Sequence, residues 1–257
     1  MALAREQQEL DGLRAEHTPE AVAERMSADP RQSYLRDTVY GAIDGCVTTF
    51  AVVSGVVGAN LDTSIVLILG FANLLADGFS MAVSNYLGTK AEQQAIQRAR
   101  KIEESHVDKI PDGEVEEIRQ IFRQKGFDGL LLERLVRVIT GDRRLWVETM
   151  LKEEWGLSLT PISPAKAGLA TFTAFVIVGF VPLFPFTVAH ALGFRDHVSF
   201  YVSAMLTACT FFGVGVLKSK YVAESWLRSG LETLLMGGGA ALLAYLVGVA
   251  LQGLGAP

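Results

Sequence analysis

Residues 38–60 read TVYGAIDGCVTTFAVVSGVVGAN and contain a single charged side chain, Asp44. A two-residue turn separates this stretch from residues 63–87, TSIVLILGFANLLADGFSMAVSNYL, in which Asp77 is the only charge. As a helix, either stretch is long enough to cross about 30 Å of hydrocarbon. The two stretches therefore predict a hairpin of membrane-spanning helices that carries one carboxylate in each arm.

Three further windows have the same character: Ala167–Leu192, Val198–Leu217 and Thr233–Leu254. The five windows hold 116 residues and two charges, although the 257-residue chain has 23 basic and 28 acidic side chains. We therefore expect an all-α polytopic membrane protein with five transmembrane helices, the third kinked by Pro182 and Pro185. This pattern excludes a soluble globule, and a net charge of −5 without a long basic run excludes a nucleic-acid binder.

The basic residues outside the windows predict the orientation. If residues 1–37 are cytoplasmic, 22 of the 23 lysines and arginines fall on the cytoplasmic side, and the exception is Arg195. Since cytoplasmic loops are enriched in basic residues, we expect a cytoplasmic N-terminal segment. This segment lacks the apolar core of a signal peptide, so the first span should be retained. The very short external turns favour a bacterial plasma membrane, and a vacuolar membrane is the alternative.

Residues 88–166 differ from the windows in composition, because they contain 14 basic and 14 acidic side chains. We expect a cytoplasmic helical domain here, inserted between transmembrane helices 2 and 3. The second span should continue as one long helix that stops at Pro111, and Asp112 should cap the next helix. The expected helices of the domain end near Gly126 and then cover Leu130–Thr140 and Arg143–Trp155. The chain thus divides into residues 1–37, 38–87, 88–166 and 167–257.

A carboxylate in the hydrocarbon region costs roughly 2.5 kcal/mol or more, so Asp44 and Asp77 need a partner, a proton or an aqueous path. Helical spacing places each of them on a stripe of small and polar residues. The two stripes comprise Asp37, Tyr40, Gly41, Asp44, Thr48 and Gly55, and Asn73, Asp77, Ser80, Met81 and Ser84. Facing each other, these stripes would line a transport path. The alternative is that small polar residues such as Thr48 and Asn73 only pack the helices together.

The cytoplasmic segment contains three groups of metal-ligand side chains: Glu103-x-x-His106, Glu114-x-x-Glu117, and Met150 with Glu153 and Glu154. Side chains three residues apart share one face of a helix and can share a cation. Carboxylate, imidazole and thioether donors suit Fe²⁺, Mn²⁺ or Zn²⁺ better than Ca²⁺ or Mg²⁺. Such pairs also occur on solvated helices without a metal, and acids in a first helical turn are favoured by the helix dipole.

Two runs of residues match a known family. Tyr40-Gly-Ala-Ile-Asp44-Gly-Cys-Val-Thr-Thr-Phe-Ala-Val-Val-Ser-Gly55 and Ala76-Asp-Gly-Phe-Ser-Met81-Ala-Val-Ser-Asn-Tyr-Leu-Gly-Thr-Lys90-Ala-Glu92 resemble the vacuolar iron transporter family, as do Pro111-Asp-x-Glu-x-x-Glu117 and Trp146-Val-x-x-Met150. The resemblance covers about residues 35–255. It implies a proton-coupled exporter of cytoplasmic Fe²⁺, often also of Mn²⁺, that works as a homodimer with its path between the two copies of the first span.

The resemblance also implies roles for individual residues. The intramembrane metal ligands of the family fall on Asp44 and Met81, and its acid at the path entrance falls on Asp37. Its cytoplasmic metal-binding positions fall on Glu103, His106, Glu114, Glu117, Met150 and Glu154. The sequence departs from the family at His106, where plant members carry Glu, and at Asn73, where many relatives carry an intramembrane Glu.

Asp77 lies one helical turn after Asn73 and is expected to take over that acidic function about 6 Å along the axis. The expected transport path therefore comprises Asp37, Asp44, Thr48, Asn73, Asp77 and Met81. Its expected partners are Fe²⁺ or Mn²⁺, protons, membrane lipid and a second copy of the chain, with no permanently bound cofactor and no enzymatic activity.

Two alternatives remain open. A metal channel without proton coupling would use the same path residues. A membrane-anchored ferroxidase of the di-iron carboxylate type would use Glu103-x-x-His106 as one of two such motifs in a four-helix bundle. Against the ferroxidase, the remaining histidines have no Glu three residues before them; they are His17, His190 and His197.

Overall fold

The computed structural model describes residues 2–27, 33–160, 162–192, 196–222 and 224–252, and every regular element in these ranges is a helix. The chain forms two compact units, residues 1–33 and 34–257. The first unit contains α1 (Ala2–Glu16) and α2 (Pro19–Ser27). The Thr18 hydroxyl accepts a hydrogen bond from the Ala21 N–H at 3.3 Å and so caps α2.

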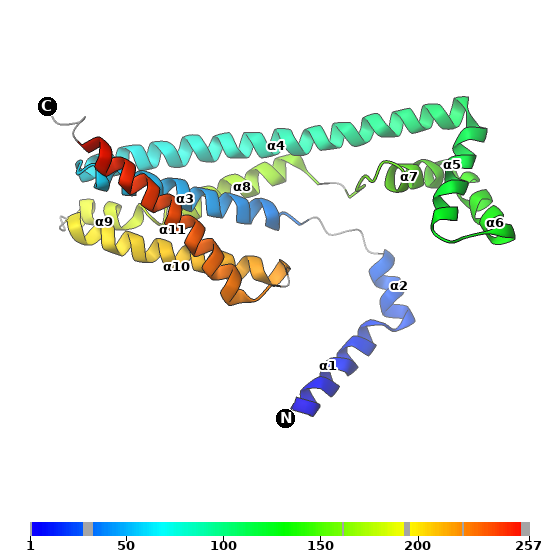
Figure 1. Cartoon of the computed structure of the whole chain (residues 1–257), viewed down its shortest axis with the longest axis horizontal. Coiled ribbons are helices and arrows are strands. Elements are labelled where there is room, and N and C mark those ends of the chain that lie inside the picture. The colour runs from blue at the N-terminus through cyan, green and yellow to red at the C-terminus, as the bar shows by residue number, and fades with distance from the viewer. Residues whose placement is uncertain (1, 28–32, 161, 193–195, 223, 253–257) are drawn as a thin grey trace. The chain divides into compact units, whose positions relative to one another are not determined.

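In the second unit, α3 (Leu35–Gly58) is the central helix of the membrane part (Figure 1). It packs against α8 (Pro164–Gly179) and α11 (Trp226–Leu251). A Cβ atom added at Gly41 or Gly45 would overlap the backbone of α8, so these two glycines let the helices approach closely. The first predicted span thus forms the core of the bundle.

Four helices are long and apolar enough to cross a membrane, namely α3, α4 (Thr63–Lys109), α10 (Asp196–Val222) and α11. A fifth span is present if α8 and α9 (Phe184–Leu192) count as one, since the two helices meet at a bend of 53°. The bend lies at the predicted kink, and the Ser203 hydroxyl donates to the freed carbonyl of Pro182 at 2.7 Å. The five predicted windows therefore correspond to four unbroken helices and one broken pair.

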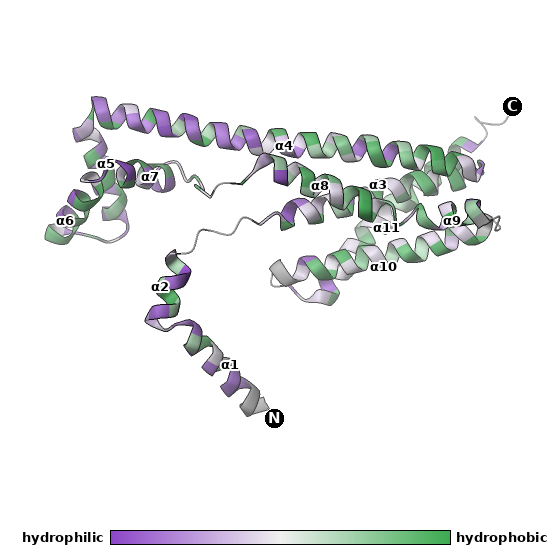
Figure 2. Cartoon of the chain, turned by 180° about the vertical axis from the view of Figure 1, so that it is seen from behind, coloured by the Kyte–Doolittle hydropathy of each residue, from purple (hydrophilic) through white to green (hydrophobic). Residues whose placement is uncertain are grey.

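Helix α4 has 47 residues and confirms the prediction of one long helix that stops before Pro111. Figure 2 shows its hydropathy changing along its length, from the hydrophobic half in the membrane bundle to the hydrophilic half beyond it. The predicted N-cap at Asp112 is wrong, because α5 (Pro111–Gln124) begins one residue earlier. Proline has no N–H to satisfy and a fixed φ that suits the first helical position, so Asp112 lies in the first turn.

The polar half of α4 packs against α5 and α7 (Arg143–Glu153), α6 (Gly129–Thr140) packs against both of these helices, and the four parts form a small domain that we call the α5–α7 domain. Helices α5 and α7 end just before the two glycines that predicted their ends. These glycines, Gly126 and Gly156, have φ values of +92° and +64°. The Asp142 side chain caps α7 by accepting from two backbone N–H groups. The apolar core of the domain comprises Ile118, Leu132, Val136, Ile139, Trp146 and Met150.

Candidate metal centre

Three of the predicted ligands come together at the junction of α4 and α5. Glu103 and His106 lie one turn apart on α4, and the sharp turn at Ile110 brings Glu114 of α5 back against them. One ligand atom from each of these side chains lies within 4.8 Å of the others. The imidazole Nδ1 of His106 is 3.2 Å from Glu114 Oε1. The i, i+3 spacing on α4 and the proline-initiated turn together produce this three-ligand cluster.

The carboxylates of the cluster are buried, with Glu103 1% and Glu114 0% exposed. Glu103 Oε1 accepts a hydrogen bond from the Trp155 indole N–H at 2.8 Å. Glu103 Oε2 and both carboxylate oxygens of Glu114 receive no hydrogen bond from any described residue. Buried acceptors without a donor are costly, and a divalent cation would satisfy these three oxygens at once. The donor set therefore fits a transition-metal ion.

The electrostatics of the cluster favour a cation or a proton. Burial, followed by the charges of Glu117 and Glu103, raises the pKa of Glu114 to about 7. A protonated Glu114 can donate a hydrogen bond to Glu103, whereas two ionised carboxylates cannot, so a proton can take the place of the cation between these two side chains. Burial and the charges of Glu103 and Glu117 also raise the pKa of Glu154, and His106 opposes that rise. Glu117 and Glu154 thus lie near the cluster.

Met150, the sixth predicted cytoplasmic ligand, is fully buried on α7 in the apolar core of the domain. Its backbone carbonyl accepts hydrogen bonds from the N–H groups of Glu154 and Trp155, at 2.9 and 3.3 Å. The sequence did not indicate Trp155, because its contact with Glu103 joins residues 52 positions apart. The position of Trp155 just before Gly156, where the helix was predicted to end, was the only feature of the sequence that could have drawn attention to it.

In the membrane part, the two predicted stripes meet at one point. The Asn73 amide of α4 donates to the Thr48 hydroxyl of α3 at 3.4 Å, and Thr48 donates to the Asp44 carbonyl at 2.9 Å. Asp44 is half-buried, and Asp77 lies near enough for the two charges to repel. Asp77 itself is exposed on α4, whereas Met81 packs against the apolar core. One chain therefore brings the stripes side by side but leaves part of the second stripe uncovered.

Asp37, the predicted entrance acid, lies in the first turn of α3. Its Oδ1 atom accepts a hydrogen bond from the Asn85 amide of α4 at 2.9 Å. The same amide donates to the buried Thr171 hydroxyl of α8 at 2.7 Å. The entrance acid is thus tied to two other helices.

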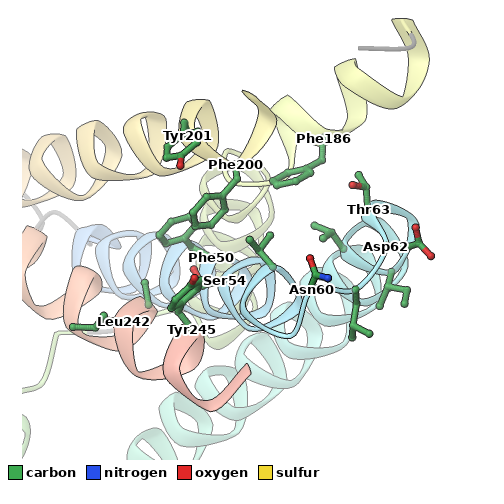
Figure 3. A pocket seen from close by; sticks show the side chains of 15 residues that line it. Phe50, Ser54, Asn60, Asp62, Thr63, Phe186, Phe200, Tyr201, Leu242 and Tyr245 are labelled. Carbon is green, nitrogen blue, oxygen red and sulfur yellow. The ribbon is translucent and has the colours of Figure 1, made fainter. Parts of the chain in front are cut away.

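A cavity of about 890 Å³ lies elsewhere in the bundle, beside the turn between α3 and α4 (Figure 3). Phe50, Ser54, Phe200 and Tyr245 line it, and Asp62 is the charged residue at its edge. None of the residues predicted to lie in the transport path or to bind metal lines this cavity. We therefore assign it no part in metal binding.

Comparison with known proteins supplies the family. The sequence profile of the VIT family matches residues 35–249. The chain is 32% identical over 257 residues to a vacuolar iron transporter of Toxoplasma gondii, covering 95% of this chain and 85% of that protein. It is 32% identical over 225 residues to a vacuolar iron transporter of Plasmodium falciparum, covering 85% and 82%. It is 31% identical over 222 residues to vacuolar iron transporter 1 of Arabidopsis thaliana, covering 85% and 86%.

Proposed function

The chain belongs to the VIT family, and from this membership we propose that it carries iron ions across a membrane. The family is one of transporters, which agrees with the prediction that the chain is not an enzyme. Helices that are long and apolar enough to span a membrane, α3, α4, α10 and α11 with the bent pair α8 and α9, support this proposal. The substrate class follows from the names of the relatives and from the donor set of the metal centre.

The observation that carries the proposal is the cluster of Glu103, His106 and Glu114. Two carboxylates and an imidazole match the preferences of Fe²⁺ and Mn²⁺, and neither ion needs the all-oxygen shell of Ca²⁺. Three buried carboxylate oxygens receive no hydrogen bond from the described residues, and a bound cation would satisfy them. We infer that the α5–α7 domain captures metal on the cytoplasmic side and raises the metal concentration near the membrane, and the excess of basic residues in this segment supports that orientation.

The path itself is proposed to run along the facing stripes of α3 and α4. The contact between Asn73 and Thr48 supports this arrangement, because it brings the two stripes together within one chain. Asp44 and Met81 supply a carboxylate and a thioether, a pair that suits a borderline metal ion. Asp77 adds a second charge beside Asp44. The cation would therefore exchange its water for these side chains as it crosses.

A homodimer would complete this path. Asp77 and Ser80 are exposed on a helix that lies in hydrocarbon, and an exposed carboxylate there is expensive. A second copy of the chain, placed against the same faces of α3 and α4, would cover these groups and duplicate Asp44 and Met81. The dimer thereby turns two incomplete stripes into one lined pathway.

Proton antiport is the proposed driving mechanism. Metal ligands must be deprotonated, so protonation of carboxylates from an acidic exterior or lumen would release the cation. Asp77 offers an ionisable group one turn from Asn73, the position where the family resemblance implies an acid. A channel differs only in lacking this coupling. The ferroxidase alternative requires a second Glu-x-x-His motif in the cluster, whereas the third ligand found there is Glu114.

Metal flux into proteoliposomes tests the proposal. Purified protein is reconstituted with a metal-sensitive dye inside, and Fe²⁺ or Mn²⁺ uptake is measured with and without an imposed pH gradient. We expect uptake of both ions, accelerated by the gradient. Uptake at the same rate with and without the gradient supports a metal channel without proton coupling. Oxygen-dependent oxidation of Fe²⁺ without uptake contradicts transport and supports the ferroxidase.

A further inference from the structure

Three helices of the membrane part meet at one side-chain amide, that of Asn85 on α4. Its nitrogen donates to Asp37 Oδ1 on α3 at 2.9 Å and to Thr171 Oγ1 on α8 at 2.7 Å. We propose that Asn85, supported by Thr171, is a positioning residue that holds the Asp37 carboxylate in place for an incoming divalent cation. This assignment rests on the proposed function, in which Asp37 stands at the cytoplasmic entrance of the path.

The hydrogen bonds of this junction fix the orientation of each group. An amide nitrogen has two hydrogens, and the two contacts use both of them. Thr171 accepts from Asn85 and retains its own hydrogen, which can go to the carbonyl of Ala167 at 3.1 Å or of Asp37 at 3.4 Å. Asn85 donates to one carboxylate oxygen of Asp37, the Oδ1 atom. We infer that this bond holds one oxygen and that the other, Oδ2, can contact a cation.

Close helix packing makes the junction stiff. A Cβ atom added at Gly41 would overlap the backbone of Thr171, and one added at Gly168 would lie 2.8 Å from the Ala82 carbonyl oxygen. Helix α8 therefore touches α3 and α4 on either side of the amide, and Thr171 is fully buried. A side chain held in this way loses little freedom when it binds a cation, so less of the binding free energy is spent on ordering.

The neutral amide also suits the purpose better than a basic residue would. A lysine or arginine beside Asp37 would hold the carboxylate equally well, but its charge would cancel the attraction for a cation. Asn85 orients the acid and leaves its negative charge available. The same hydrogen bond could instead serve only to clamp three helices together, and a purely structural clamp makes different predictions.

Matched variants separate the two roles. Asn85→Leu removes the donors and keeps the branched shape and the number of side-chain heavy atoms, and Asn85→Gln retains an amide. Gln93→Leu is the control, because Gln93 is another α4 amide that donates to a backbone carbonyl, that of Ile162 at 2.6 Å, away from Asp37. We expect Asn85→Leu to raise the Mn²⁺ concentration for half-maximal flux by about tenfold with little change in maximal flux. Gln93→Leu should not change it, and Asn85→Gln should restore part of the loss.

A second measurement keeps the assignment independent of transport. In a full-length Glu103→Gln, Glu114→Gln background, Mn²⁺ binding is followed by electron paramagnetic resonance with Asp37→Asn and Asn85→Leu added in turn. Weaker binding in both variants supports the positioning role even if the protein moves no metal, an outcome that contradicts only the proposed function. If Asn85→Leu lowers the melting temperature as Gln93→Leu does, but leaves Mn²⁺ binding and half-saturation unchanged, the assignment is wrong.

Discussion

The α5–α7 domain and the membrane part both remove carboxylates from water, but they complete their sites in different ways. In the domain, Glu103 and Glu114 are buried within one chain and meet His106 within 4.8 Å. In the membrane part, Asp44 is half-buried and Asp77 is exposed. The three-ligand cluster is thus complete within one chain, whereas we propose that a second copy of the chain completes the transport path.

The largest effect is expected from Asp44→Asn. Removing the charge from the proposed path should lower metal flux by about a hundredfold or more, because the bare cation loses its main attraction in a low-dielectric region. Flux into proteoliposomes measures it, with Asp62→Asn at the turn between α3 and α4 as the control. Metal binding by the α5–α7 domain should stay normal in both variants. Normal flux in Asp44→Asn would show that the path lies elsewhere.

Glu114→Gln should act on the domain and leave the membrane part intact. Loss of a buried ligand is expected to weaken metal binding by roughly a hundredfold, as measured by calorimetry on the full chain. Glu116→Gln is the matched control on the same helix, because Glu116 is exposed and pairs with Arg119. Maximal flux at saturating metal should persist. A loss of both binding and maximal flux in Glu114→Gln would remove the distinction between the two regions.

The pH dependence of the domain follows from the pKa of Glu114, raised from 4.5 to about 7. A proton competes with the metal for this carboxylate, so affinity should fall as the pH drops through about 7, by up to about tenfold per pH unit. The folded domain holds this proton up to a higher pH than the unfolded chain does. Its contribution to stability is therefore complete below pH 4.5 and is lost as the pH rises to about 7.

Calorimetry of metal binding and thermal unfolding of metal-free protein, each between pH 5 and pH 8, test both signs. Glu114→Gln should flatten the two profiles. Metal affinity that rises on acidification would contradict the assignment of Glu114 as a ligand.

Trp155→Phe is expected to have the smallest effect. The variant removes the N–H that orients Glu103 while keeping an aromatic ring, and the loss of such a supporting hydrogen bond should weaken metal binding by about tenfold. Trp226→Phe, at the start of α11, provides the control. Quenching of tryptophan fluorescence on addition of Mn²⁺ should be smaller in Trp155→Phe than in the control. Equal affinity and equal quenching would mean that Glu103 needs no such support.

Much of the fold could be predicted from the sequence, because hydropathy and the helix-breaking residues report on it directly. The apolar windows located the membrane helices, and Pro111 marked the end of α4. Helix α11 begins at Trp226, seven residues before the window that predicted it, since Ser225 caps a turn that hydropathy alone does not detect. Asp112 was misplaced because the preference of proline for the first helical turn outweighed that of an acid for the cap.

The candidate site was predictable only where its residues are near in sequence. The spacing of Glu103 and His106 guarantees a shared helix face, and the turn at Pro111 adds Glu114. Contacts between distant segments were not visible, such as Trp155 with Glu103 or Asn85 with Thr171. These contacts depend on how helices pack, and the spacing and hydropathy of residues along one sequence do not reveal that packing.

We propose that one region of the molecule captures the metal and that the other conducts it. The most direct test measures bound metal and metal flux on the same reconstituted protein, for the wild type, Asp44→Asn and Glu114→Gln. We expect binding without flux in Asp44→Asn, and weakened binding with near-normal maximal flux in Glu114→Gln. If each variant loses both metal binding and metal flux, or if Asp44→Asn conducts metal normally, the two regions do not have these separate roles.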